Sequence, residues 1–392
     1  MKSEKTSASR MVEAGRSHAI NPGPVNPPIV RASTFLFDTL ADFQKAGSRP
    51  FDGAFYGRVG TPTTFAFEDA ICEIEGGHRS IATASGLAAI SATLLACLEK
   101  GDHLLMVDTV YDPARRFANR TLKRMGVDTT FYDPALGDDI ASLIRPETKL
   151  IYLESPGTGT FEVQDIAAIV RAAKKAGVRT AIDATWATPL LLRPLEHGID
   201  ISIHAATKYI VGHSDAMLGV VTANAETYDD VRRATQDMGA SAGIEECNLG
   251  LRGLRTLELR LRRHEASALE LARWLEKRPD IAKVYHPALP GAAGHEFWSR
   301  DFDGASGVFS VELHKRHPDA LRSFVDALDM FRIGFSWGGF ESLVLPAHPE
   351  TRTLPLWNDR GPIIRLQIGL EDVDDLRADL ERALDGLQGL AE

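Results

Sequence analysis

Cysteines are scarce in this chain, and long apolar runs and excess positive charge are missing. Its three cysteines, Cys72, Cys97 and Cys247, are far apart and odd in number, so they offer no disulfide framework and favour a reducing compartment. No run of about 18 apolar residues occurs, which argues against a membrane-spanning helix. The net charge of -10 argues against nucleic-acid binding as the main function.

Several signatures of common enzyme classes are also missing. The chain has no GxGxxG, no GxxxxGK[ST] and no HExxH, so neither a dinucleotide fold, a P-loop enzyme nor a zinc protease is indicated. The histidines show no ligand-like spacing, so we expect no metal site. The polar start, MKSEKTSASR, precedes no apolar segment, and we therefore expect a cytoplasmic protein rather than a secreted one.

One short motif does match a known enzyme class. The residues from Gly334 through Ser336 to Gly338 fit GxSxG, the nucleophile elbow of serine hydrolases. That elbow needs a helix after the serine, but the following GGFESLVLP contains glycine, a strand-like run and proline. We therefore interpret the match as chance for hydrolysis, although these residues could still line a site.

The 392 residues suggest two or three domains, and the composition is that of a globular protein, with 44% hydrophobic residues. Residues 1–60 contain two proline-rich stretches, NPGP and NPP, which forbid a continuous helix. Because a structureless start of this length is unusual inside a compact domain, we predict an extended arm over 1–60 that packs on another subunit.

From about residue 64 onward, apolar strands and helices alternate. Such alternation indicates an α/β fold with a mostly parallel sheet. We predict helices at 64–75, 86–98, 113–125 and 163–176, and strands at 103–107, 149–153, 179–182, 199–203 and 217–222.

The second half of the chain begins with an amphipathic stretch. Residues 245–276 predict one long connecting helix, and shorter alternating elements and a final helix at 372–387 follow. We therefore predict a large domain over 61–255 and a smaller C-terminal α/β domain over 256–392.

Two residues follow apolar strands and suit an imine-forming cofactor. Asp183 comes at the carboxyl end of the strand at 179–182, and Lys208 follows the strand at 199–203. Open α/β sheets bind ligands at the carboxyl ends of their strands, so both residues could reach one crevice. A lone lysine is usually a surface charge, but in an apolar site its pKa falls and it becomes nucleophilic. Pyridoxal phosphate needs such a lysine and an acid for its ring nitrogen.

This cofactor also needs a phosphate site and tolerates a stacked aromatic ring. Ser85, Gly86 and Leu87 begin an apolar helix, whose free N–H groups would hold a phosphate, although a plain serine cap has the same pattern. Tyr111 lies just past the strand at 103–107, where its ring could stack on the pyridine, although a loop tyrosine is the ordinary alternative.

These residues are parts of longer stretches that resemble one known family. The chain is similar to the Cys/Met-metabolism family of pyridoxal-phosphate enzymes, of fold type I, over nearly its whole length. The most specific stretch is AATKYIVGHSDAM at 205–217. Shorter ones are YGR at 56–58, SGL at 85–87, YDP at 111–113, ESPG at 154–157, DATWATP at 183–189, FSWGGFES at 335–342 and IRLQIGLE at 364–371.

The resemblance implies roles for the residues around the cofactor ring. Lys208 would form the imine with the cofactor and remove a proton from the substrate. Asp183 would pair with the ring nitrogen, and Tyr111 would stack on the ring and also take part in catalysis.

The resemblance also implies how the phosphate is held. The amides of Gly86 and Leu87 and the hydroxyl of Thr207 would bind it within one subunit. Tyr56 and Arg58 would reach the site of a neighbouring subunit, with Tyr56 also taking part in catalysis. A homo-oligomer follows, with a dimer as the minimal active unit and a tetramer, a dimer of dimers, as the expected assembly.

Three residues would bind the substrate. Arg365 would clamp the α-carboxylate, which suits the planar fork of a guanidinium. Ser336 would lie beside it, and the ring of Trp337 would fill the distal part of the site, as in the β-lyase branch of the family. Phe335 and Asp237 depart from that branch, whose close members carry tyrosine there, so the shape of the substrate pocket stays open.

The resemblance therefore implies a carbon–sulfur lyase that converts L-cystathionine to homocysteine, pyruvate and ammonia in methionine biosynthesis. Another β-lyase of the family, acting on cysteine or cystine, is the nearest alternative, and a γ-lyase is less favoured. A regulatory or binding protein that keeps the fold is a further alternative, although no basic region or appended DNA-binding motif supports it.

Overall fold

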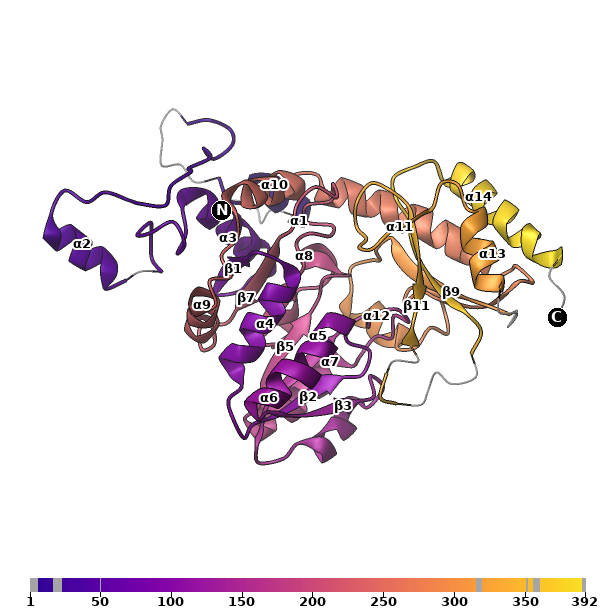
Figure 1. The fold of residues 1–392 in the computed structure, drawn as a ribbon, viewed down its shortest axis with the longest axis horizontal. Helices are drawn as coiled ribbons and strands as arrows, with labels where there is room; N and C mark the ends of the chain where they lie inside the picture. The colour runs from indigo at the N-terminus through magenta and orange to yellow at the C-terminus, as the bar shows by residue number, and fades with distance from the viewer. Residues whose placement is uncertain are drawn as a thin grey trace.

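The computed structural model describes residues 6–16, 23–49, 51–314, 319–349, 352–354 and 360–389. They form two sheets, each covered by helices (Figure 1). The larger, seven-stranded sheet has the order β1-β7-β6-β5-β4-β2-β3. Neighbouring strands are parallel from β6 to β3, whereas β7 is antiparallel to both β6 and β1. The strands are β1 (Arg79–Thr83), β2 (His103–Val107), β3 (Asp128–Tyr132), β4 (Thr148–Glu154), β5 (Arg179–Asp183), β6 (Ile201–His204) and β7 (Gly219–Ala223). The predicted mostly parallel α/β sheet is confirmed.

The central strands are apolar because helices cover both faces of the sheet. Every residue of β2 and β6 is buried. The surrounding helices include α3, which begins where Thr61 and Thr64 cap each other and ends at Gly76 in the left-handed region (φ 75°). These helices are α3 (Pro62–Glu75), α4 (Gly86–Cys97), α5 (Asp112–Phe117), α6 (Lys123–Met125), α7 (Ile166–Ala176), α8 (Thr188–Leu191) and α9 (Tyr228–Asp237).

The parallel strands end along one edge of the large sheet. Glu154, the last residue of β4, is in register with Asp183, the last residue of β5, and Asp183 is in register with Ile203 near the end of β6. The loops that leave this edge therefore bring residues distant in sequence together, as open α/β sheets do at their binding sites.

The smaller sheet has the order β10-β11-β12-β9-β8 and its own core. Its strands are β8 (Ile281–Tyr285), β9 (Val308–Leu313), β10 (Arg332–Ile333), β11 (Leu343–Ala347) and β12 (Ile363–Gln367). Its helices are α12 (His295–Asp301), α13 (Ala320–Ala327) and α14 (Val373–Asp385). This unit is the smaller C-terminal α/β part that the sequence predicts, and it lies beside the large sheet in Figure 1.

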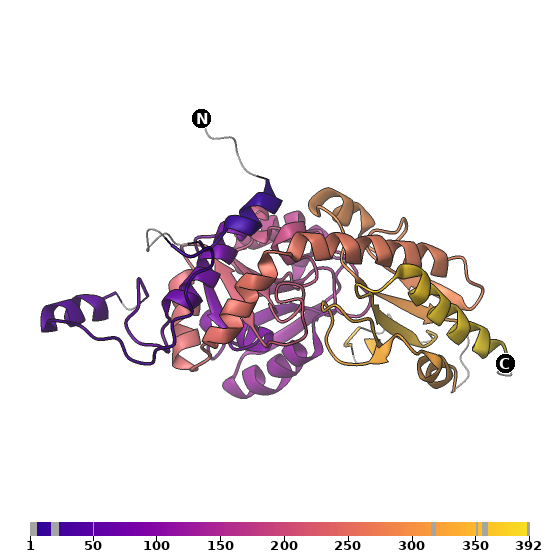
Figure 2. The same cartoon turned by 90° about the horizontal axis from the view of Figure 1, so that it is seen from above.

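Two helices occupy the stretch that the sequence predicts as one. The prediction of a single helix over 245–276 is wrong, because α10 (Ile244–Leu254) ends before α11 (Leu257–Leu275) begins (Figure 2). The buried guanidinium of Arg260 donates hydrogen bonds to the carbonyls of Gly253 at 2.8 Å and Tyr209 at 2.7 Å. A carbonyl of the last turn of α10 is thus bound by a side chain of the next helix.

Two short helices interrupt the stretch predicted to be irregular. In α1 (Ser7–Glu13), Met11 is buried, and α1 contacts α3. The second, α2 (Leu40–Gly47), has no buried residue and projects away from both sheets in Figures 1 and 2. Among the described helices, none combines the length and the apolar character that crossing a membrane requires.

Candidate active site

Lys208 lies in the loop between β6 and β7, just past the carboxyl end of β6. Its half-buried side chain donates a hydrogen bond from Nζ to Ser336 Oγ at 2.5 Å. Burial, reinforced by the positive charge of Arg365, lowers the pKa of the Lys208 amine to about 8, although the charge of Asp183 opposes this. Part of the Lys208 amine is therefore neutral, and so nucleophilic, near neutral pH.

The loop after β10 packs directly on Lys208. Ser336 has a left-handed backbone (φ 80°), which is strained for a residue other than glycine. At Gly338 a Cβ would lie 2.7 Å from Tyr209 N, so only glycine fits this approach. The Trp337 ring lies 5.4 Å from Lys208 Nζ. No helix follows Ser336 in the described residues 337–342, so the nucleophile elbow of a serine hydrolase is absent.

Asp183 presents one carboxylate oxygen for a ligand. Its Oδ1 accepts hydrogen bonds from the backbone N–H of Thr185 at 2.9 Å and from the Thr185 hydroxyl at 2.5 Å. Oδ2 has no hydrogen bond to any residue that the structure describes. Burial raises the pKa of Asp183, although the Thr185 hydrogen bonds counteract it. The loop residue Thr185 thus orients the acid that the sequence singles out.

Arg365 is half-buried on β12 and carries an uncompensated charge. Its Nη2 donates to the Ser336 carbonyl at 2.8 Å, and its Nε is buried without a hydrogen-bond partner. No acidic side chain among the described residues forms an ion pair with it. Burial lowers the pKa of the guanidinium to about 10. A desolvated guanidinium of this kind suits the carboxylate of a substrate.

The predicted phosphate site lies at the start of α4. Ser85 caps the helix by accepting the N–H of Ala88 at 3.1 Å, which leaves Gly86 and Leu87 as the other donors of the first turn. Gly86 packs against the segment before Lys208, since a Cβ there would lie 2.4 Å from the Ala205 Cβ. The first turn of α4 and the lysine loop are therefore neighbours.

The hydroxyl of Thr207, a predicted phosphate ligand, forms hydrogen bonds to the backbone of Leu218. It donates to the Leu218 carbonyl at 3.1 Å and accepts the Leu218 N–H at 2.8 Å. To donate to a phosphate, it would have to give up the Leu218 carbonyl.

Tyr56 and Arg58 lie outside the cluster around Lys208. Both are exposed, and the described contacts join neither of them to Lys208 within the chain. The guanidinium of Arg58 donates to the carbonyl and the side-chain oxygen of Gln236, and Ser241 donates to the Arg58 carbonyl at 2.6 Å. The arm is therefore held to the last turn of α9 and to the loop that follows it.

Glu154 is a functional candidate that the sequence reasoning did not single out as a site residue. It ends β4 beside Asp183, and its Oε2 accepts the backbone N–H of Tyr111 at 2.7 Å. Burial, together with the charge of Asp183, raises the pKa of Glu154 to about 8. Its signal in the sequence is the same as that of Asp183: a carboxylate that ends an apolar strand.

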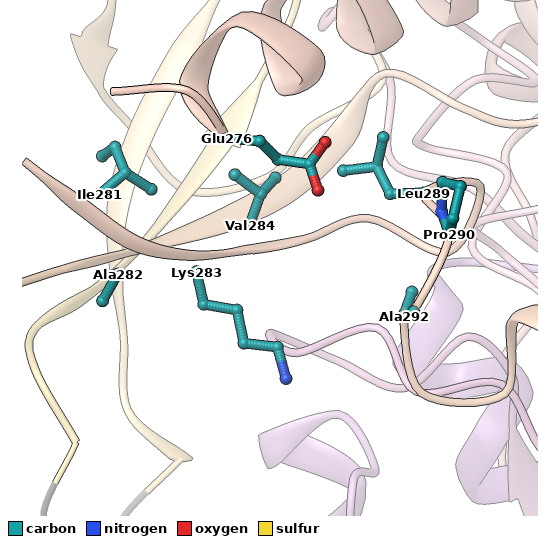
Figure 3. A pocket seen from close by; sticks show the side chains of 9 residues that line it. Glu276, Ile281, Ala282, Lys283, Val284, Leu289, Pro290 and Ala292 are labelled. Atoms are coloured by element: carbon teal, nitrogen blue, oxygen red, sulfur yellow. The ribbon is translucent and has the colours of Figure 1, made fainter. Parts of the chain in front are cut away.

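A separate pocket lies at the outer edge of β8 (Figure 3). It measures about 210 Å³, and Glu276 and Lys283 are the charged residues of an otherwise apolar lining. None of its lining residues is a predicted site residue. This pocket is therefore not part of the cluster around Lys208.

The residues around Lys208 fit pyridoxal phosphate. A lysine of lowered pKa can form the imine, and Asp183 keeps one oxygen for the ring nitrogen. The first turn of α4 can accept the phosphate. The half-exposed ring of Tyr111 is close enough to Asp183 and Glu154 for their charges, after burial, to raise its pKa.

Comparisons with known proteins point in the same direction. Residues 8–385 match the model of the family described as Cys/Met metabolism PLP-dependent enzyme. A putative cystathionine beta-lyase of Rhizobium johnstonii is 47% identical over 95% of this chain and 94% of its own. The cystathionine beta-lyase of Escherichia coli is 44% identical over 96% and 98%. The solved cystathionine gamma synthase of Xanthomonas oryzae pv. oryzae is 32% identical, with a TM-score of 0.88 over 98% of this chain and 99% of its own.

Proposed function

The chain belongs to the family of Cys/Met metabolism PLP-dependent enzymes, of fold type I, and from this premise we propose that it is a cystathionine β-lyase. In this proposal it catalyses the α,β-elimination of L-cystathionine to homocysteine, pyruvate and ammonia. Relatives named as cystathionine beta-lyases, 44% and 47% identical over most of the chain, support the choice of substrate.

The observation that carries the proposal is the juxtaposition of Lys208, Asp183 and Arg365. Pyridoxal phosphate, when bound, withdraws electrons from the substrate Cα. Lys208 is placed to take the Cα proton, since its amine has a pKa of about 8 and is partly neutral at neutral pH. The same Nζ can then return a proton to the departing sulfur. Asp183, whose Oδ1 is occupied by Thr185, would pair through Oδ2 with the protonated ring nitrogen of the bound cofactor.

The substrate is oriented by the residues opposite Lys208. Arg365 binds the α-carboxylate, because its guanidinium is desolvated and has no acidic partner among the described residues. Its hydrogen bond to the Ser336 carbonyl ties this clamp to the loop that also holds Lys208 Nζ. Trp337, whose ring lies 5.4 Å from Lys208 Nζ, would fill the distal part of the substrate site.

Product analysis with cystathionine tests the proposed reaction. We expect pyruvate and homocysteine in equal amounts from the protein loaded with pyridoxal phosphate, and none from Lys208→Ala. Production of α-ketobutyrate would instead show γ-elimination. Faster pyruvate release from cysteine or cystine than from cystathionine would show a different β-lyase. No product from cystathionine, cysteine or cystine would refute the lyase proposal.

The arm gives the proposal its second part, a homo-oligomer. Leu36 is 94% exposed, Leu40 and Phe43 are also exposed, and no residue of α2 is fully buried within the chain, although the Phe43 ring contacts Phe37 and Phe55. A large exposed apolar surface is typical of an interface. We propose that the part of the 1–60 arm that follows α1 packs on a second copy and brings Tyr56 and Arg58 to its phosphate site. Light scattering should show a dimer or a tetramer, and Phe43→Asp should shift it toward the monomer.

We also propose domains over 61–255 and 256–392 and a cytoplasmic location. The domain boundary coincides with the break between α10 and α11. The location is supported by Cys72, Cys97 and Cys247, which are all unpaired. Limited proteolysis near the helix break and cell fractionation test these two points.

A further inference from the structure

The carboxylate of Glu154 joins two loops at the edge of the large sheet. Its Oε2 accepts the N–H of Tyr111, in the loop between β2 and α5, at 2.7 Å. Its Oε1 accepts the hydroxyl of Thr158, in the loop between β4 and α7. The side chain is buried at the end of β4, so its place is set by the sheet rather than by the loops.

The two loops are also in direct backbone contact. Thr158 donates its N–H to the Thr109 carbonyl at 2.8 Å. At Gly157 a Cβ would lie 2.3 Å from Thr109 Oγ1, so the loops approach as closely as glycine allows. Glu154 therefore fills a junction in which both carboxylate oxygens have a defined donor.

Among the described residues, Glu154 is the one hydrogen-bond acceptor of the Tyr111 backbone N–H. Tyr111 precedes the first turn of α5, and no side chain of its own loop caps that helix. The residue is 42% exposed, so packing alone does not hold it. The hydrogen bond from its backbone N–H to Oε2 of the buried Glu154 therefore holds this end of the loop, because losing the acceptor would leave the donor unsatisfied.

We propose that Glu154 is a positioning residue, which holds the ring of Tyr111 against the cofactor by fixing the Tyr111 backbone from the end of β4. This inference rests on the proposed cofactor site, because the ring of Tyr111 matters only if a pyridine ring lies beneath it. Glu154 acts through Tyr111 and does not touch the substrate. Burial and the charge of Asp183 raise its pKa, but the hydrogen bond to the Tyr111 N–H does not need a particular charge state.

The side-chain chemistry predicts which replacements keep this role. In Glu154→Gln the amide oxygen still accepts the Tyr111 N–H, and the amide nitrogen can donate to the Thr158 oxygen. In Glu154→Ala both contacts are lost. Thr158→Val is the matched control, because it removes the other hydrogen bond of the same carboxylate and leaves the Tyr111 contact in place.

Hydrogen exchange of the full chain, followed by mass spectrometry, tests the positioning step without the cofactor. The amide of Tyr111 should exchange about tenfold faster or more in Glu154→Ala, and at the wild-type rate in Glu154→Gln and Thr158→Val. Unchanged exchange in Glu154→Ala would overturn the inference. Faster exchange in Glu154→Gln would overturn it too, because the charge and not the hydrogen bond would then matter.

Cofactor titration tests the consequence. Glu154→Ala should bind pyridoxal phosphate about tenfold more weakly, with an altered visible circular dichroism. In a Tyr111→Ala background the same change should have no further effect, since Glu154 acts through that ring. Additive losses in the double variant would refute the inference. If the wild-type chain bound no pyridoxal phosphate, the proposed function would fail, whereas the exchange experiment would still decide the role of Glu154.

Discussion

Glu68→Ala should destabilise the protein more than almost any surface change, because it leaves a buried guanidinium without its counter-ion. Arg232 is 1% exposed, and its Nη1 lies 2.8 Å from Glu68 Oε1. The same oxygen accepts the N–H of Ala82 in β1 at 2.9 Å. After the change, the guanidinium of Arg232 keeps a hydrogen bond to the Val59 carbonyl at 2.6 Å and its place over the Phe51 ring, but it has no ion pair with any other described residue.

The size of the effect follows from these contacts. Breaking a buried ion pair typically costs about 3–5 kcal/mol. The N–H of Ala82 also loses its acceptor, so we expect the free energy of unfolding to fall by about 4 kcal/mol. Burial raises the pKa of Glu68 even though Arg232 opposes it, which shows that the charges are held at a desolvation cost. The loss of stability in Glu68→Ala therefore comes mainly from leaving the Arg232 charge buried and unpaired, rather than from losing a large net attraction between the two charges.

Urea unfolding followed by circular dichroism, at one protein concentration, measures this change. Asp326→Ala is the matched control, because its pair with Arg322 at 3.3 Å is exposed on both sides. Exposed pairs contribute about 0–1 kcal/mol. A loss of less than about 1 kcal/mol in Glu68→Ala, or equal losses in the two variants, would refute the reasoning.

The remaining predictions concern pH and binding. His286 accepts the Ala288 N–H on Nδ1, and burial lowers its pKa to about 4 from 6.5, so the unfolded chain binds more protons between these values. As the pH drops from 7 to 4, protonation of His286 in the unfolded chain should therefore lower the free energy of unfolding by about 3 kcal/mol. In His286→Asn, the urea midpoint should fall less over the same pH range than in the wild-type chain. The apoprotein should bind pyridoxal phosphate roughly tenfold faster at pH 9 than at pH 7, because the Lys208 amine, with a pKa of about 8, becomes neutral over this range. Stopped-flow absorbance measures the binding rate, and a rate that does not change with pH would contradict the prediction. Arg365→Gln should raise the KM for cystathionine at least about tenfold, while the affinity for pyridoxal phosphate measured by titration stays unchanged. A weaker affinity for the cofactor would contradict the assigned role.

Much of the fold could be read from local patterns. Apolar runs such as 103–107 and 179–182 are strands because a doubly covered parallel sheet buries both their faces, and glycines such as Gly76 and Gly177 end the helices between them. The strands β1 and β3 could not be predicted from apolar runs, because RSIAT and DTTFY mix polar and apolar residues. The break between α10 and α11 could not be predicted from the local sequence either, because a side chain from the following helix binds the carbonyl of Gly253.

The sequence by itself determined the chemical parts of the site. A carboxylate and a lysine after apolar strands indicate a site at the carboxyl edge of a parallel sheet, since strand ends meet there whatever the loops do. The motifs around Lys208 carry the family resemblance, and the comparisons confirm the family.

Only the tertiary structure decided how these parts are held. The register of β4 and β5 sets Glu154 beside Asp183, and the fold then brings Tyr111, 43 residues away in sequence, onto its carboxylate. The hydrogen bond between Lys208 and Ser336 spans 128 residues and depends on a strained loop of the other sheet. Such contacts are set by packing between distant segments, and no local periodicity or spacing encodes them.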